Sequence, residues 1–230
     1  MMRQLVLLSA GLDSTVNLYL AREKGEVGLV LTFHYGQRAA GQEVERSRAI
    51  CAEAGVPHEV LALPWLGERS ECALTRPRLP LPLREGDGWV RPDGAINSAA
   101  EQVWVPNRNG VFVNVAAALA EAEGMDLVVA GFNAEEAAAF PDNSAAFVER
   151  AGLALELSTR GKVRLKSYTL HMAKAEIARE GERLGIPWKL LWSCYNGGGL
   201  MCGRCESCAR LLRALRVVGL EGRLVGMFRE

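Results

Sequence analysis

Short apolar runs alternate along the chain with longer segments in which apolar and polar residues recur at helical spacing. Near the start, Gln4–Leu8, Glu26–His34 and His58–Leu63 are strand-like, because they concentrate Val, Leu and aromatic residues. Between them, Asp13–Glu23 and Arg38–Gly55 have the amphipathic pattern of helices. This order predicts βαβ units, and therefore an α/β fold around a parallel sheet.

The proline-rich segment Pro64–Pro106 interrupts this alternation and predicts irregular structure. Connections this long are usually either functional or disordered, and we expect an insertion beside a site. The later pattern predicts helices over Gly110–Gly124, Asn143–Leu155, His171–Gly185 and Glu206–Val218, a strand over Asp126–Phe132 and an extended Val163–Lys166. Because no linker or repeat separates these parts, one domain is expected over residues 1–230, with residues 188–230 as its C-terminal part.

Composition adds limits on partners. The 230 residues are 49% hydrophobic and 23% charged, which is typical of a folded globular protein. The net charge is zero, whereas proteins that bind nucleic acid broadly usually carry a basic excess. The apolar start is too short for a signal peptide, and no stretch has the length of a membrane span. We therefore expect a cytoplasmic protein with no direct nucleic-acid partner and no membrane partner.

The cysteines are unevenly placed, with four of the six between residues 194 and 208. Their spacing is C-x7-C-x2-C-x2-C, formed by Cys194, Cys202, Cys205 and Cys208. In a reducing compartment such a cluster favours a metal over disulfides. Four thiolates suit a closed, structural Zn²⁺ site, and an iron–sulfur cluster is the alternative. Cys51 is expected in the core, and Cys72 in a segment where it could be exposed.

A turn of small residues, Ser9-Ala10-Gly11, follows the first predicted strand. Backbone N–H groups of such a turn, with the positive end of the helix after it, can bind an anion. Ser9 and Ser14 could donate to phosphate oxygens, and Asp13 could hold Mg²⁺ or cap the helix. An ordinary helix N-cap explains the same residues, so spacing alone leaves both interpretations open.

Further candidates follow other predicted strands. Tyr35 and Gln37 could contact a purine or another substrate, since open α/β sheets bind ligands at the carboxyl ends of their strands. Arg108 could bind phosphate or carboxylate as a fork, with a loop arginine beside an Asn cap as the alternative. Glu136 and Asp142 could contact polar groups of a substrate, although Asp142 could equally be a helix cap.

Several charged residues are expected in solvent. Glu135 is one of them. Most of a basic stretch near the later strand is also expected there, and one of its members could neutralise triphosphate charge: Lys162, Arg164, Lys166 and Lys174.

These motifs, in this order, resemble the QueC family of queuosine biosynthesis over nearly the whole chain. The turn Ser9–Ser14 is similar to the PP-loop, S-G-G-x-D-S, of ATP pyrophosphatase-type enzymes, with Ala10 in place of a usual Gly. The other similar segments are Phe33–Arg38 (F-D-Y-G-Q-R), Val105–Asn109 (V-P-G-R-N), Gly131–Asp142 (G-x-N-A-x-D…Y-P-D), Lys174–Ile177 (K-A-E-I) and Trp192–Tyr195 (W-S-C-Y).

The resemblance implies a Rossmann-like parallel sheet of the adenine nucleotide alpha hydrolase type, with helices on both faces and a C-terminal zinc-binding segment. It also implies a reaction in which 7-carboxy-7-deazaguanine and ammonia give 7-cyano-7-deazaguanine. One ATP, with Mg²⁺, activates the carboxylate as an acyl adenylate, and ammonia then forms the amide. A second ATP activates the amide oxygen, whose loss leaves the nitrile. A homodimer is compatible with the resemblance.

The resemblance further implies roles for particular residues. It implies catalytic roles for Asp13, Ser14 and Arg108. It implies that ATP is bound by Leu8, Ser9, Ala10, Gly11, Leu12, Asp13, Ser14, Thr15, Val16, Asn17 and Leu18. Substrate binding falls to Tyr35, Gln37, Asn133, Glu136 and Asp142. One Zn²⁺ per chain would be held by Cys194, Cys202, Cys205 and Cys208.

Departures from the family pattern keep other functions open. His34 stands where the family has Asp, and Asn143-Ser144 stands where Cys-Arg is common, which removes a positive charge that could face the substrate carboxylate. A ligase that amidates a related carboxylate is therefore an alternative. So is a PP-loop enzyme that modifies tRNA, although the zero net charge counts against it. A zinc module for nucleic acid is disfavoured by the βαβ body.

Overall fold

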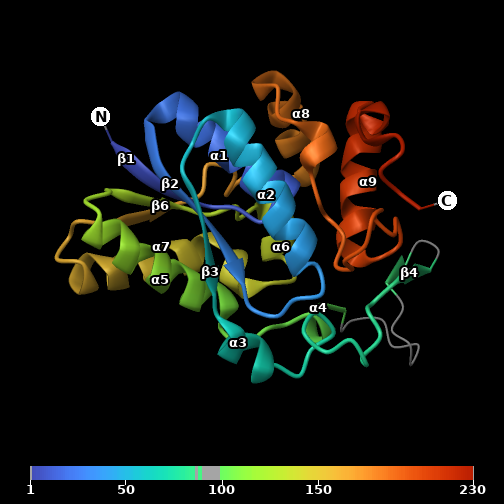
Figure 1. The fold of residues 1–230 in the computed structure, drawn as a ribbon, viewed down its shortest axis with the longest axis horizontal. Helices are drawn as coiled ribbons and strands as arrows, with labels where there is room; N and C mark the ends of the chain where they lie inside the picture. The colour runs from blue at the N-terminus through green and yellow to red at the C-terminus, as the bar shows by residue number, and fades with distance from the viewer. Residues whose placement is uncertain (1, 86–87, 90–98, 230) are drawn as a thin grey trace.

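A computed structural model describes residues 2–85, 88–89 and 99–229 (Figure 1). Its main sheet has the strand order β3-β2-β1-β6-β7, and every neighbouring pair is parallel. The strands are β1 (Arg3–Leu7), β2 (Glu26–His34), β3 (His58–Ala62), β6 (Leu127–Val129) and β7 (Arg164–Lys166). The predicted α/β fold with a parallel sheet is confirmed.

Helices cover both faces of the sheet, because successive residues of a strand point to opposite sides. Val6 and Val30 pack in a core cluster with α1, α2, α8 and α9, whereas Leu5 and Leu31 pack in another with α5 and α7 (Figure 1). These helices are α1 (Leu12–Lys24), α2 (Ala40–Ala54), α5 (Arg108–Ala122), α7 (Ala145–Ser158), α8 (Lys174–Leu184) and α9 (Glu206–Val218). None of the described helices combines the length and apolar character needed to cross a membrane.

The proline-rich segment contains more regular structure than its composition predicts. Its described elements are α3 (Pro64–Glu68), the hairpin of β4 (Arg84–Glu85) and β5 (Gly88–Trp89), and α4 (Ala99–Gln102). The remainder of the predicted insertion, residues 86–87 and 90–98, lies outside the described residues. Leu74 and Val103 line the cavity described below, so the described part of this segment lies beside the candidate site.

Short elements elsewhere were not predicted, because a single turn has no periodicity to detect. They are α6 (Ala134–Ala137) and the 3₁₀ turns η1 (Pro141–Asn143), η2 (Trp188–Leu190) and η3 (Glu221–Leu224). The expectation for Cys51 is confirmed, since it is 1% exposed, but the expectation for Cys72 is wrong. Cys72 is 2% exposed, because the proline-rich segment folds onto the core and Cys72 packs with Leu74 there.

The strand order determines where a ligand can bind. From β1 the chain runs outward to β2 and β3, whereas β6 and β7 lie on the other side of β1. The connections that leave the carboxyl ends of β1 and β6 therefore diverge, and such a switch point leaves a crevice between them. The turn at Ser9 follows β1 directly, so it lies in this crevice. Gly131, after β6, packs behind the turn, and a Cβ on it would lie 2.8 Å from the backbone nitrogen of Ser14.

Candidate active site

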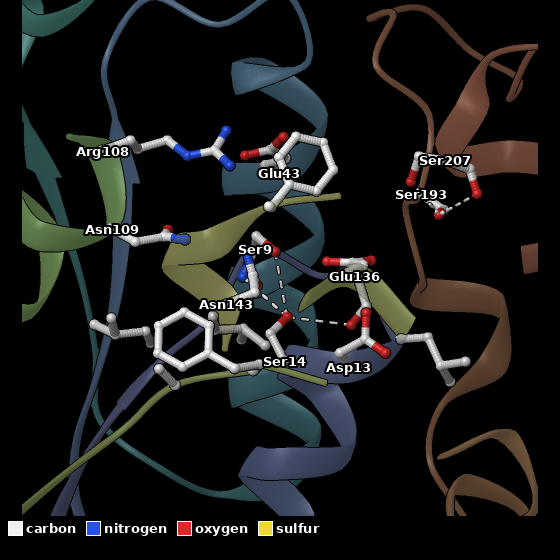
Figure 2. A pocket seen from close by; sticks show the side chains of 18 of the residues that line it. Ser9, Asp13, Ser14, Glu43, Arg108, Asn109, Glu136, Asn143, Ser193 and Ser207 are labelled. Carbon is white, nitrogen blue, oxygen red and sulfur yellow. Dashed lines mark hydrogen bonds between the residues drawn. The ribbon is translucent and has the colours of Figure 1, made fainter. Parts of the chain in front are cut away.

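A cavity of about 260 Å³ opens at the switch point (Figure 2). Its wall comes from the turn after β1, the ends of β2 and β6, and the first turns of α2, α5, α8 and α9. The candidates from the sequence that line it are Leu8, Ser9, Gly11, Leu12, Asp13, Ser14, Tyr35, Arg108, Glu136 and Cys194.

Other candidates lie near these lining residues along the chain but do not themselves line the cavity. They are Ala10, Thr15, Val16, Asn17, Leu18, Gln37, Asn133 and Asp142. Val16 and Leu18 point into the core cluster on one face of the sheet. Asn17 joins α1 to the segment after β7, since its amide nitrogen donates to Thr169 Oγ1 at 2.7 Å.

The turn after β1 leads into α1 beside the cavity, and its backbone includes one left-handed residue. Ala10 has a φ of 57°, in the left-handed region where Gly is favoured, which explains why a Gly is usual at this position. Ser14 Oγ accepts from the Ser9 backbone nitrogen at 3.2 Å and donates to the Gly11 carbonyl at 3.2 Å. Gly11, without any side-chain cap bond, is the N-cap of α1. Asp13 is therefore not the helix cap, and the positive end of α1 faces the cavity.

Three ionisable side chains meet at the floor of the cavity. Lys174 Nζ contacts an oxygen of Asp13 and lies 3.0 Å from Glu136 Oε1. Burial raises the pKa of Asp13 to about 6, against the opposing effect of Lys174. Burial alone would lower the pKa of Lys174, but the two carboxylates raise it above its ordinary value. Asp13 Oδ1 is buried and has no hydrogen-bond partner among the described residues, so one oxygen of this cluster is available to a ligand.

Lys162, Arg164 and Lys166 are exposed, as expected for most of the basic stretch, whereas Lys174 is only 4% exposed and lines the cavity. The reason is that α8 begins at Lys174 and packs along α1, which brings together residues 161 positions apart. Glu135 is half-buried, and its carboxylate pairs with Arg213 of α9.

The polar candidates outside the cavity have local structural roles. Asn133 caps α6 by accepting from the Glu136 backbone nitrogen at 2.8 Å, which positions Glu136 at the cavity. The Asp142 carbonyl accepts from Asn109 Nδ2 at 3.3 Å, and the cap of α7 is Ser144. Asn143, the neighbour of Asp142, lines the cavity.

Arg108 and Tyr35 form the opposite wall of the cavity. Arg108 is the first residue of α5, and Asn107 before it makes no side-chain cap bond. Arg108 Nη1 lies 3.2 Å from the Tyr35 hydroxyl oxygen. Burial raises the pKa of Tyr35, so this hydroxyl stays neutral and Arg108 remains the cation. Figure 2 shows Arg108 extending toward Glu43, which the sequence analysis did not single out.

The start of α9 adds residues that the sequence analysis also missed. Glu206 accepts from the Tyr195 hydroxyl at 2.8 Å and pairs with Arg210, and all three line the cavity. Arg210 is 9% exposed, and its Nη1 has no partner among the described residues. These residues could have been identified from the sequence, because Glu206 and Arg210 lie within one helical turn of the predicted metal-binding cysteines.

The four clustered cysteines form a site that fits a tetrahedral metal. Their sulfur atoms all lie within 4.8 Å of one another, and Zn–S bonds of about 2.3 Å require separations of roughly 3.8 Å. Backbone N–H groups point at these sulfurs, as Cys205 N does toward Cys202 Sγ at 3.2 Å. Cys205 is the N-cap of α9, so the cluster holds the helix that carries Arg210 into the cavity.

The parallel sheet, with helices on both faces and a C-terminal cysteine cluster, defines an α/β fold of the adenine nucleotide alpha hydrolase-like type. NMN synthetase from Francisella tularensis has a similar fold, with 14% identity, a TM-score of 0.50, and coverage of 99% of this chain and 87% of that one. A 4-thiouridine synthetase in complex with RNA and ATP has 16% identity, a TM-score of 0.50, and coverage of 98% and 54%.

The family model for "Queuosine biosynthesis protein QueC" matches residues 3–219, and the chain belongs to this family. Its relatives include the 7-cyano-7-deazaguanine synthases of Pelotomaculum thermopropionicum, 50% identical over 96% of this chain and 99% of that protein, and of Desulforamulus reducens, 48% identical over 96% of each. The enzyme of that name from Methanosarcina mazei is 38% identical over 97% of this chain and 98% of its own length. The resemblance expected from the motifs is confirmed.

Proposed function

We propose that this chain converts 7-carboxy-7-deazaguanine and ammonia to 7-cyano-7-deazaguanine with two molecules of ATP. In the first step a substrate carboxylate oxygen attacks the α-phosphorus and pyrophosphate leaves. Ammonia then displaces AMP and loses a proton, which gives the amide. The amide oxygen attacks a second ATP in the same way, and loss of AMP and of both amide protons leaves the nitrile.

The observation that carries this proposal is the position of the small-residue turn at the switch point, beside a buried carboxylate with a free oxygen. Ser9 and Ser14 present hydroxyl groups and α1 its positive end, which suits a polyphosphate. Bound Mg²⁺ would neutralise polyphosphate charge, and Asp13 Oδ1 is the oxygen that fits it. The ATP in the 4-thiouridine synthetase complex supports a nucleotide on this fold.

The remaining cavity residues would position the substrate and stabilise charge. Lys174 and Arg210 are buried cations that line the cavity, and they would face the reacting carboxylate and the phosphates. Arg210 would supply the charge that the Asn143-Ser144 departure removes. Arg108 would donate to an oxygen of the substrate. The cysteine cluster would hold one structural Zn²⁺, because four thiolates leave no open position for catalysis.

The test is incubation of the purified chain with 7-carboxy-7-deazaguanine, ammonium chloride and MgATP, with product mass and nucleotides recorded together. The expected result is the nitrile, with about two AMP and two pyrophosphate released per product. Amide without nitrile would instead indicate an amidating ligase. No turnover, together with tRNA binding in a low-salt gel shift, would favour the tRNA-modifying alternative.

A further inference from the structure

Among the acidic residues that line the cavity, Glu43 has a role that neither the motifs nor the proposed chemistry assigns. Glu43 lies in the first turn of α2 and lines the cavity at the end opposite Asp13 (Figure 2). Burial raises the pKa of Glu43, although Arg108 opposes this effect. A half-buried carboxylate beside a guanidinium would ordinarily form an ion pair, yet no Lys or Arg among the described residues lies within 4.0 Å of it.

Gln37 holds one oxygen of Glu43 in place. The Gln37 side-chain oxygen accepts from the Tyr35 backbone nitrogen at 2.9 Å, and its Nε2 donates to the Phe33 carbonyl at 3.0 Å. Nε2 also donates to Glu43 Oε2 at 2.9 Å. Both ends of the Gln37 amide are thus occupied, and Gln37 is a positioning residue rather than a substrate contact. Glu43 Oε1 has no hydrogen-bond partner within the described part of the chain, so it is left to accept from a ligand.

The surroundings of Glu43 suit a flat heterocycle. Phe33 and Phe112 stack with ring centroids 4.1 Å apart, and Tyr35 tilts against Phe112 at 5.6 Å. All three rings line the cavity. Figure 2 shows Glu43 and Arg108 directed toward each other from α2 and α5, which places an acceptor and a set of donors along one edge of this aromatic wall.

We infer that Glu43 is the specificity-determining residue that reads the 2-amino-pyrimidin-4-one edge of the substrate ring. That edge carries two adjacent N–H donors, which a carboxylate accepts together, and a carbonyl oxygen, which suits Arg108. The adenine edge instead has an unprotonated ring nitrogen, whose lone pair a carboxylate repels. Glu43 would therefore keep the adenine of ATP out of the substrate end of the cavity. This inference rests on the proposed function for the identity of the ring.

The test compares Glu43→Gln and Glu43→Ala with Glu45→Gln, a matched control at an exposed position of the same helix. Glu43→Gln should lower kcat/KM for 7-carboxy-7-deazaguanine by roughly 10²-fold or more, because it places a donor against a donor. The dissociation constant of ATP should stay within about threefold, and Glu45→Gln should match the wild type. For an analogue without the 2-amino group, kcat/KM should be roughly 10- to 100-fold lower than for 7-carboxy-7-deazaguanine in the wild type. This difference should be much smaller in Glu43→Ala.

The inference would be overturned if Glu43→Ala kept the full preference of the wild type for the substrate over the analogue without the 2-amino group. It would also be overturned if the variants lost affinity for ATP in parallel with affinity for the substrate. Binding of 7-deazaguanine, followed by tryptophan fluorescence, gives a readout that needs no turnover. If the wild type binds this ring and Glu43→Gln does not, the inference stands even when no nitrile forms. The proposed function would then fail alone. If both proteins bind the ring equally, the inference fails whatever the turnover assay shows.

Discussion

Replacing Lys174 by Met should destabilise the fold strongly, because Lys174 is the cation between two buried carboxylates. It is 4% exposed and contacts both Asp13 and Glu136. Removing one partner from a buried ion pair costs about 3–5 kcal/mol, since the remaining charge loses its compensation. For a chain of this length each kcal/mol lowers Tm by about 2–4 °C, so Lys174→Met should lose roughly 6–20 °C. The matched control is Lys162→Met at an exposed position, which should change stability by no more than about 0.5 kcal/mol.

The pH dependence of this loss tests its cause. Without Lys174, burial and mutual repulsion raise the pKa of one carboxylate above its unfolded value. The stability of the variant is then retained at low pH and is lost as pH rises through that raised pKa. Thermal scans should therefore show a smaller deficit at about pH 5 than at about pH 8. The double variant Asp13→Asn/Lys174→Met should recover part of the loss at high pH. A deficit below about 1 kcal/mol at high pH, or one that does not change with pH, would refute the reasoning.

Four further results are expected. Mass spectrometry of the native protein should show about one Zn²⁺ per chain, and chelation should free the clustered thiols to a thiol reagent and lower Tm. Ala10→Gly should change the free energy of unfolding by less than about 1 kcal/mol, because relief of the left-handed conformation offsets the loss of the buried methyl group. The control Ala178→Gly, at an equally buried position within α8, should lower the free energy of unfolding in urea by about 1.5–2 kcal/mol. Arg210→Lys should lower kcat/KM about 10²-fold with little change in Tm, and an unchanged kcat/KM would contradict its proposed role. Burial lowers the pKa of His58, so the neutral imidazole contributes stability at neutral pH, and this contribution is lost as the pH falls. In His58→Gln, Tm should therefore fall less steeply than in the wild type as the pH is lowered.

The periodicity of the sequence was sufficient to predict the sheet and most helices. The bounds predicted for Glu26–His34 and Glu206–Val218 agree with the structure, because each segment has a strong pattern and a clear stop signal. The strand predicted to end at Phe132 ends at Val129, since Gly131 passes behind the turn at Ser14. That close approach depends on a tertiary contact, which a one-dimensional pattern does not contain.

The site was predictable where its residues follow a strand and less so where helices supply them. The turn at Ser9 and the loop residue Tyr35 follow β1 and β2 directly, so strand topology places both at the cavity. Lys174, Glu43 and Arg210 lie on helices, where the sequence gives a face but not the neighbour that this face meets. Gln37 shows the opposite error, because a polar residue at the correct strand end is occupied by backbone partners.

The spacing of Cys205 and Cys208 also sets the rotational phase of α9. Cys205 is the N-cap of that helix, Glu206 and Cys208 lie in its first turn, and Arg210 follows in the next turn. One residue inserted between the two cysteines would rotate everything after it by about 100°, turning the guanidinium away from the cavity while the sulfurs could still gather around a metal. Insertions and deletions here are therefore constrained twice, once by coordination and once by the direction in which α9 presents its charge. In a homologue with a different spacing between these two cysteines, we expect residues other than Arg210 to form this part of the cavity wall.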